Sequence, residues 1–141
     1  MRKSSLAIGT ISGVFLGLSL KLVQALTGIN VYTLLLNIDF IPIAGKVDYP
    51  EYVEFLIHLG TSILIVWVYL KVLYRFTYFS INKWILAFLM IIPPILLYFP
   101  LSALAEKPVP NWHDWPAILI WSAGHLLYAL LIAAMAKNDA A

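Results

Sequence analysis

A polar stripe runs along one long apolar segment of the chain, residues 51–71. Glu54, His58 and Ser62 follow one another at four-residue spacing, and Glu51 comes just before them. Residues three or four positions apart share one face of a helix, while the other faces here carry Leu, Ile, Val, Phe and Trp. Because an unpaired charge in lipid is costly, such a stripe on a membrane helix faces partner helices or a water-filled cavity.

A second histidine stands in a similar setting near the C-terminus. Trp121, His125 and Tyr128 share one face of the apolar segment 116–136, and Gly124 permits close approach of a neighbouring helix. Histidine is the side chain whose charge changes near neutral pH. We therefore treat this face as the second half of a candidate site.

These two faces allow several kinds of chemistry. Glu54, His58 and His125 together suit a proton relay of the kind found in transporters. The two histidines also suit a haem iron bound from both sides, and with Glu54 they suit a zinc or iron site. In the remaining interpretation, the polar side chains hydrogen-bond across helices and fix their register.

No cofactor is predicted outright, and nothing in the sequence argues for an enzyme. The chain lacks the zinc-protease, P-loop, serine-hydrolase and dinucleotide-binding motifs. It contains no cysteine, which excludes disulfides, thiolate metal sites and cysteine nucleophiles. A net charge of +2 gives no indication of a nucleic-acid partner.

Composition identifies the environment of the chain. Of the 141 residues, 62% are hydrophobic and 11% are charged, whereas soluble domains are about half apolar and about a quarter charged. The length leaves room for four short-looped helices and no separate soluble domain. The sequence predicts a single-domain, all-α integral membrane protein with four transmembrane helices, at about 5–26, 51–71, 83–99 and 116–136.

Glycines mark the packed face of the first helix. Gly9, Gly13 and Gly17 recur every four residues, and Lys21 continues the same stripe. Glycine in this register lets another helix approach closely, either within the chain or in a homo-oligomer. We expect Lys21 either to reach the membrane surface with its long side chain or to pair with a glutamate of the second helix.

The remaining segments complete the predicted architecture. Pro93 and Pro94 stand in the middle of the third helix and predict a kink, because proline removes a backbone donor and clashes with the preceding turn. Residues 29–50 contain an apolar run too short to cross a membrane, which favours an interfacial or re-entrant segment. Residues 100–116 are rich in Pro and Trp, and we expect them to anchor at the membrane surface.

The distribution of basic residues predicts the orientation. One side of the membrane carries Lys46 and Lys107, and the other carries Arg2, Lys3, Lys71, Arg75, Lys83 and Lys137. Basic residues are enriched on the cytoplasmic side, so both termini are expected in the cytoplasm. The unusual polar residues then lie at similar depths in the outer half of the bundle. We expect one pocket there, lined by Lys21, Glu54, His58, Ser62, Trp121, His125 and Tyr128.

Several short motifs resemble the YagU-type family of small bacterial inner-membrane proteins. They are His58 followed by Ser62-Ile63, Tyr98-Phe99-Pro100-Leu101, the stretch 112–115, and Gly124-His125-Leu126. The resemblance covers roughly residues 50–135, and the loop between the first two helices does not match. It implies a bacterial inner-membrane location and a link to acid tolerance, with no established substrate or catalytic residues. It points to His58 and His125.

The leading functional prediction is a non-enzymatic inner-membrane protein that senses or conducts protons or small solutes, with a link to acid stress. One alternative is a haem- or metal-binding membrane redox protein. The other is a structural accessory subunit of a larger membrane complex. The expected partners are the lipid bilayer and either further copies of the chain or a membrane partner subunit, with no nucleic acid.

Overall fold

The computed structural model describes residues 3–76 and 81–136, and this part of the chain is helical without strands. The elements are α1 (Lys3–Thr27), α2 (Val31–Leu35), the 3₁₀ turn η1 (Ala44–Lys46), α3 (Glu51–Arg75), α4 (Lys83–Met90), α5 (Ile92–Leu96), α6 (Tyr98–Leu104) and α7 (Trp115–Met135). Four stretches are long and apolar enough to cross a membrane: Ser4–Thr27, Glu51–Arg75, Lys83–Leu104 and Trp115–Met135. The predicted all-α architecture with four such helices is confirmed.

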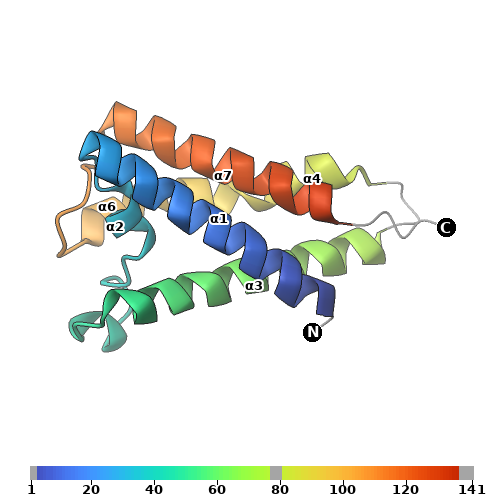
Figure 1. The fold of residues 1–141 in the computed structure, drawn as a ribbon, viewed down its shortest axis with the longest axis horizontal. Coiled ribbons are helices and arrows are strands. Elements are labelled where there is room, and N and C mark those ends of the chain that lie inside the picture. The colour runs from blue at the N-terminus through green and yellow to red at the C-terminus, as the bar shows by residue number, and fades with distance from the viewer. Residues whose placement is uncertain (1–2, 77–80, 137–141) are drawn as a thin grey trace.

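The bundle has two ends, which we call the loop end and the terminal end. At the loop end, α1 and α6 finish and α3 and α7 begin; at the terminal end, α1 and α4 begin and α3 and α7 finish (Figure 1). α1 packs against α3 and α7, and α7 also packs against α4. α3 and the third span approach each other at the terminal end and diverge towards the loop end, where α2 and residues 36–50 lie (Figure 1).

The third span is interrupted twice and reaches beyond its predicted end at residue 99. α4 stops before Ile91, α5 carries Pro93 and Pro94 in its first turn, and α6 follows Leu97. Proline is tolerated in a first turn, where its missing N–H has no helical partner in any case. Ile91 and Leu97 keep right-handed helical backbone angles, so the span continues through both interruptions to Leu104.

Side-chain caps set two of the helix starts. Asn82 accepts a hydrogen bond from the Trp84 backbone N–H at 2.9 Å at the start of α4. Asp114 accepts one from the Ala117 N–H at 3.2 Å at the start of α7. Each cap satisfies a backbone donor that the first helical turn leaves unpaired.

The glycine stripe of α1 packs against α3 of the same chain. A Cβ atom at Gly9 would stand 2.5 Å from the Cα atom of Ile63, and one at Gly13 would stand 2.8 Å from the Cβ atom of Ser62. Such close approach increases van der Waals contact where lipid removes the hydrophobic drive for helix association. The stripe is therefore covered within one chain and offers no free surface to a second copy.

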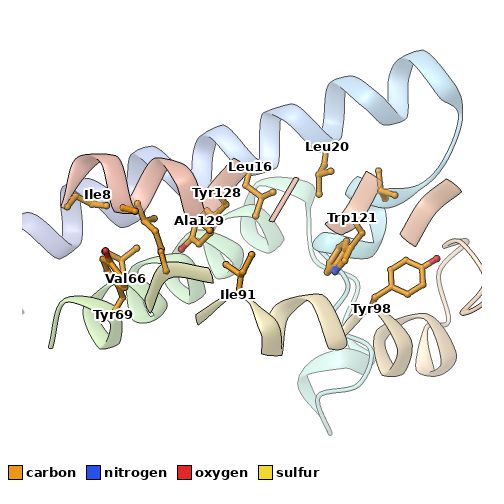
Figure 2. Packing of buried hydrophobic residues seen from close by; sticks show 14 of the residues in the cluster. Ile8, Leu16, Leu20, Val66, Tyr69, Ile91, Tyr98, Trp121, Tyr128 and Ala129 are labelled. Carbon is orange, nitrogen blue, oxygen red and sulfur yellow. The ribbon is translucent and has the colours of Figure 1, made fainter. Parts of the chain in front are cut away.

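Buried apolar side chains fill the space between α1, α3, α4 and α7. Leu16 and Leu20 of α1, Val66 of α3, Ile91 and Trp121 belong to this cluster, and all are at most 3% exposed (Figure 2). Large apolar residues also cover the outside of the bundle, as suits contact with lipid. The packed cluster holds α3 and α7 in fixed register, and so positions their polar faces.

Candidate functional site

A cavity of about 190 Å³ lies between α3, α5, α7 and the segment that follows α2. Most of its lining is apolar, from residues such as Leu16, Ile57 and Leu97. The polar side chains that were predicted to share a pocket all line it with the exception of Lys21; they are Glu54, His58, Ser62, Trp121, His125 and Tyr128. Asn37, which follows α2, lines it as well.

His58 reaches across from α3 to the backbone of α1. Its Nε2 atom lies 3.0 Å from the carbonyl oxygen of Gly13. A carbonyl oxygen only accepts hydrogen bonds, so Nε2 carries the proton and Nδ1 holds a lone pair when the ring is neutral. The absence of a side chain at Gly13 gives the ring access to this carbonyl.

His125 is more deeply buried, with 3% of its surface exposed. Its Nδ1 atom lies 2.8 Å from the carbonyl oxygen of Trp121, one turn earlier in α7. By the same reasoning Nδ1 is the donor and Nε2 holds the lone pair. The Trp121 ring lies beside the imidazole, with ring centroids 4.5 Å apart.

The second nitrogen of each imidazole is therefore a hydrogen-bond acceptor. Neither His58 Nδ1 nor His125 Nε2 bonds to another described residue. Among the residues that the structure describes, no fully buried side-chain nitrogen or oxygen lacks a partner, so both atoms keep some exposed surface, and both residues line the cavity. The cavity thus presents two acceptor nitrogens in largely apolar surroundings.

Ser62 and Tyr128 line the part of the cavity nearer the terminal end, as does Ile65 one turn further along α3. The Ser62 hydroxyl donates to the carbonyl oxygen of Gly9 at 2.7 Å. Because that hydroxyl has one proton, Tyr128 donates to the Ser62 Oγ atom, 3.0 Å away. This chain of hydrogen bonds joins α7, α3 and α1 at one level of the bundle.

Glu54 is paired with a residue that the sequence interpretation left out of the pocket. Its Oε1 atom accepts a hydrogen bond from Lys107, in the connection between α6 and α7, and the two form an ion pair. Asp39 holds the same connection by accepting hydrogen bonds from the backbone N–H groups of Glu106 and Lys107, at 2.7 and 3.2 Å. No local pattern around Lys107 indicates this partner, because it is 53 positions away in the sequence.

Lys21 lies outside the cavity. It forms an ion pair with Glu51, whose Oε1 atom also accepts a hydrogen bond from the Tyr32 hydroxyl at 2.9 Å. Burial, together with the bond to Glu51, raises the pKa of the Tyr32 phenol well above its usual range. Gln24 holds α2 in place by accepting hydrogen bonds from the N–H groups of Tyr32 and Thr33, at 2.9 and 3.0 Å. This network holds α2 against α1 and α3, and none of its residues lines the cavity.

Trp121 links α7 to the interrupted third span. Its indole Nε1–H donates to the carbonyl oxygen of Pro94 at 3.1 Å. The predicted kink at Pro93 and Pro94 therefore has a specific partner on another helix. Since Pro94, Trp121 and His125 all line the cavity, this bond also fixes the shape of its wall.

The cavity does not match the cofactors considered from the sequence. Within residues 3–76 and 81–136, no group of three or more His, Asp or Glu side chains is placed to hold a metal ion. Pockets for drug-sized ligands measure about 300–1,000 Å³, so a cavity of 190 Å³ has no room for a haem macrocycle. A smaller, uncharged or singly charged molecule suits this space better.

No family model, curated protein or solved structure matches this chain. The functional interpretation therefore rests on the geometry of the cavity and on the chemistry of the residues that line it.

Proposed function

We propose that this chain is a non-enzymatic membrane protein that senses a small solute or a proton in the cavity between α3, α5 and α7. The observation that carries the proposal is the pair of acceptor nitrogens, His58 Nδ1 and His125 Nε2, open to one mostly apolar space. Either nitrogen takes a proton, or accepts a hydrogen bond from a solute that brings its own donor.

The dimensions of the cavity define the solute class. An apolar cavity of about 150 Å³ in another protein binds benzene, so 190 Å³ suits a molecule of similar or slightly larger size. The apolar lining favours a hydrocarbon body, and the two acceptor nitrogens favour one hydroxyl or amino group. Small aromatic or aliphatic alcohols and amines meet both conditions.

Binding is better supported than conduction across the membrane. Beyond Ser62 and Tyr128, towards the terminal end, the interior of the bundle is mostly apolar, with Val66, Ile132 and Ala133 fully buried. The buried residues with a hydroxyl group there, Ser5 and Tyr69, do not line the cavity. A proton or ion path needs polar groups or water along its length. The polar residues of the site stop partway through the bundle, which suits a sensor.

The solute reaches the site from the lipid. Ile57 and Thr61 of α3 and Leu97 beside α5 line the cavity and are also exposed on the outer surface of the bundle. The opening between α3 and α5 therefore faces the surroundings of a membrane helix. Small alcohols and amines partition into a bilayer, so this entrance meets them at raised concentration.

The proposal includes the predicted topology. Both termini lie in the cytoplasm of a bacterial cell, and the loop end with its cavity lies in the outer half of the inner membrane, because six basic residues fall on the terminal side. Residues 29–50 then form an interfacial cap. In this orientation, acid outside the cell reaches His58 before His125, because His58 lies nearer the loop end. The link to acid tolerance is part of this proposal and is the one that the resemblance to YagU-type proteins implies.

Nuclear magnetic resonance of the histidine rings tests the proposal directly. The full chain, labelled with nitrogen-15 in histidine, is placed in lipid nanodiscs and titrated with benzyl alcohol or with toluene. These probes have nearly the same shape, and only the alcohol has a donor. We expect benzyl alcohol to shift the nitrogen-15 resonances of His58 Nδ1 and His125 Nε2. The protonated ring nitrogens should remain His58 Nε2 and His125 Nδ1.

His113 provides the control within the same sample. It lies exposed in the connection between α6 and α7 and does not line the cavity, so its resonances should not respond to either probe. Equal shifts with toluene and benzyl alcohol, or no shift at either buried histidine, would refute the hydrogen-bonding role. Assignment of the ring protons to His58 Nδ1 or His125 Nε2 would do so as well.

A further inference from the structure

A second concave surface lies at the opposite end of the bundle from the cavity. This groove, of about 390 Å³, runs between the start of α1 and the last turns of α3. One wall is Ser5 of α1; the other is formed by Trp67, Leu70, Lys71, Tyr74 and Arg75 of α3. None of these residues lines the cavity that holds His58 and His125.

The groove carries two positive charges, from Lys71 and Arg75. Lys71 and Arg75 are exposed, and neither forms an ion pair with another residue in the described part of the chain. The acidic residues of that part all lie at the loop end: Asp39, Asp48, Glu51, Glu54, Glu106 and Asp114. Within residues 3–76 and 81–136, an anion that meets the terminal end therefore finds two cations and no acidic side chain beside them.

The two cations are placed to act together. Lys71 and Arg75 are four positions apart in α3, so their side chains leave the same face of the helix. The guanidinium group of arginine presents several N–H donors in a fork that matches phosphate oxygens, and lysine adds a compact charge. The Lys71 Nζ atom lies 4.9 Å from the centre of the Trp67 ring, which keeps the ammonium beside the groove.

The apolar part of the groove suits the rest of a lipid. Trp67 lies one turn before Lys71 and Leu70 directly before it, both nearer the middle of the span than the two cations. Tryptophan and tyrosine prefer the level of the headgroups in a bilayer, where one edge of the ring meets water. A ligand with a phosphate group and an attached acyl chain therefore matches the order of side chains along α3.

We propose that this groove binds the headgroup of an anionic phospholipid, with Lys71 and Arg75 contacting the phosphate and Trp67 contacting the start of an acyl chain. The proposal is independent of the function assigned to the cavity. With the termini in the cytoplasm, the site lies in the cytoplasmic leaflet.

Native mass spectrometry of the full chain in a neutral detergent tests the site. The protein is titrated with dioleoyl phosphatidylglycerol or with dioleoyl phosphatidylcholine, which have the same acyl chains and differ in net charge. We expect phosphatidylglycerol to bind about 10-fold more tightly, and Lys71→Gln or Arg75→Gln to weaken it by about 5-fold each, since one cation near a membrane surface contributes about that factor. Phosphatidylcholine binding should change little.

Two control variants and a soluble competitor test whether the groove is the binding site. Lys46→Gln removes an exposed lysine at the loop end and should leave phosphatidylglycerol binding unchanged. Arg75→Lys keeps the charge and should retain most of the preference. Equal affinity for the two lipids, or equal losses in Lys46→Gln and Lys71→Gln, would overturn the proposal. Displacement of phosphatidylglycerol by millimolar glycerol phosphate would also overturn it, since the ligand would then be a free phosphate.

Discussion

Lys107, in the connection between α6 and α7, forms an ion pair with Glu54 near the start of α3. The Glu54 side chain is 8% exposed and that of Lys107 is 31% exposed, so the carboxylate is the more deeply buried partner. α3 diverges from the third span at this end (Figure 1), and the ion pair joins α3 to the connection between α6 and α7. It therefore holds together two walls of the cavity.

Replacement of Lys107 should lower the free energy of unfolding more than replacement of an exposed charged residue does. Lys107→Met leaves the Glu54 carboxylate buried without its cation, and we expect a loss of about 2 kcal/mol, less than for a fully buried pair because Lys107 is partly exposed. The double variant that combines Glu54→Gln with Lys107→Met should recover most of this loss. Reversible unfolding in mixed detergent micelles, followed by helical circular dichroism, measures both.

The Lys21–Glu51 pair supplies the matched control, since each of its side chains is more than half exposed. Lys21→Met should cost at most about 1 kcal/mol, as exposed pairs do. Equal costs for Lys21→Met and Lys107→Met would show that burial of Glu54 does not govern the stability of this end.

Helical spacing predicts much of this site because it operates within one element. It places Glu54, His58 and Ser62 on one face of α3, and all three line the cavity. Helical spacing does not predict the partner of Glu54, because Lys107 lies in the connection between α6 and α7. The path of that connection depends on hydrogen bonds to Asp39, which is distant in the sequence. Lys21 lies outside the cavity because it pairs with Glu51, at the first turn of α3.

The contact between α1 and α3 predicts opposite effects for two glycines. Gly9→Ala would bring a Cβ atom within 2.5 Å of the Ile63 backbone, so the helices must separate, at a cost of about 1–3 kcal/mol as in other overpacked cores. At Gly60 an added Cβ meets nothing within 4 Å, and Gly60→Ala should be neutral or stabilising. The same unfolding titration compares them, and an equal loss for the two would contradict close packing of the glycine stripe.

The bond between Trp121 and Pro94 predicts a loss on removal of the indole donor. Trp121→Phe keeps an aromatic ring but leaves the Pro94 carbonyl without this partner, and should cost about 1–3 kcal/mol. Trp112→Phe, in the exposed loop before α7, should stay within about 0.5 kcal/mol of the parent chain. If Trp121→Phe is as stable as Trp112→Phe, the bond does not support the kinked span.

The spacing of the histidines in the sequence does not predict which nitrogen of each ring carries the proton. The sequence brings His58 and His125 to similar depths, but their protonated nitrogens follow from the carbonyl oxygens of Gly13 and Trp121. The first of these contacts crosses between helices and exists because Gly13 has no side chain. The third span shows the same limit, since the Pro- and Trp-rich composition of residues 100–116 predicts an end near residue 99, while the backbone continues through α6 to Leu104.

The proposed orientation predicts on which side of the inner membrane each end of the bundle lies. The chain has no cysteine, so a single introduced thiol can be labelled without background. Val47, after η1 at the loop end, and Ser4, at the start of α1, are both exposed. In intact bacterial cells, a membrane-impermeant maleimide should label Val47→Cys at once, and Ser4→Cys only after the inner membrane is permeabilised. The reverse pattern would place the cavity in the inner leaflet, away from external acid, and would remove the physical basis for linking His58 to acid stress.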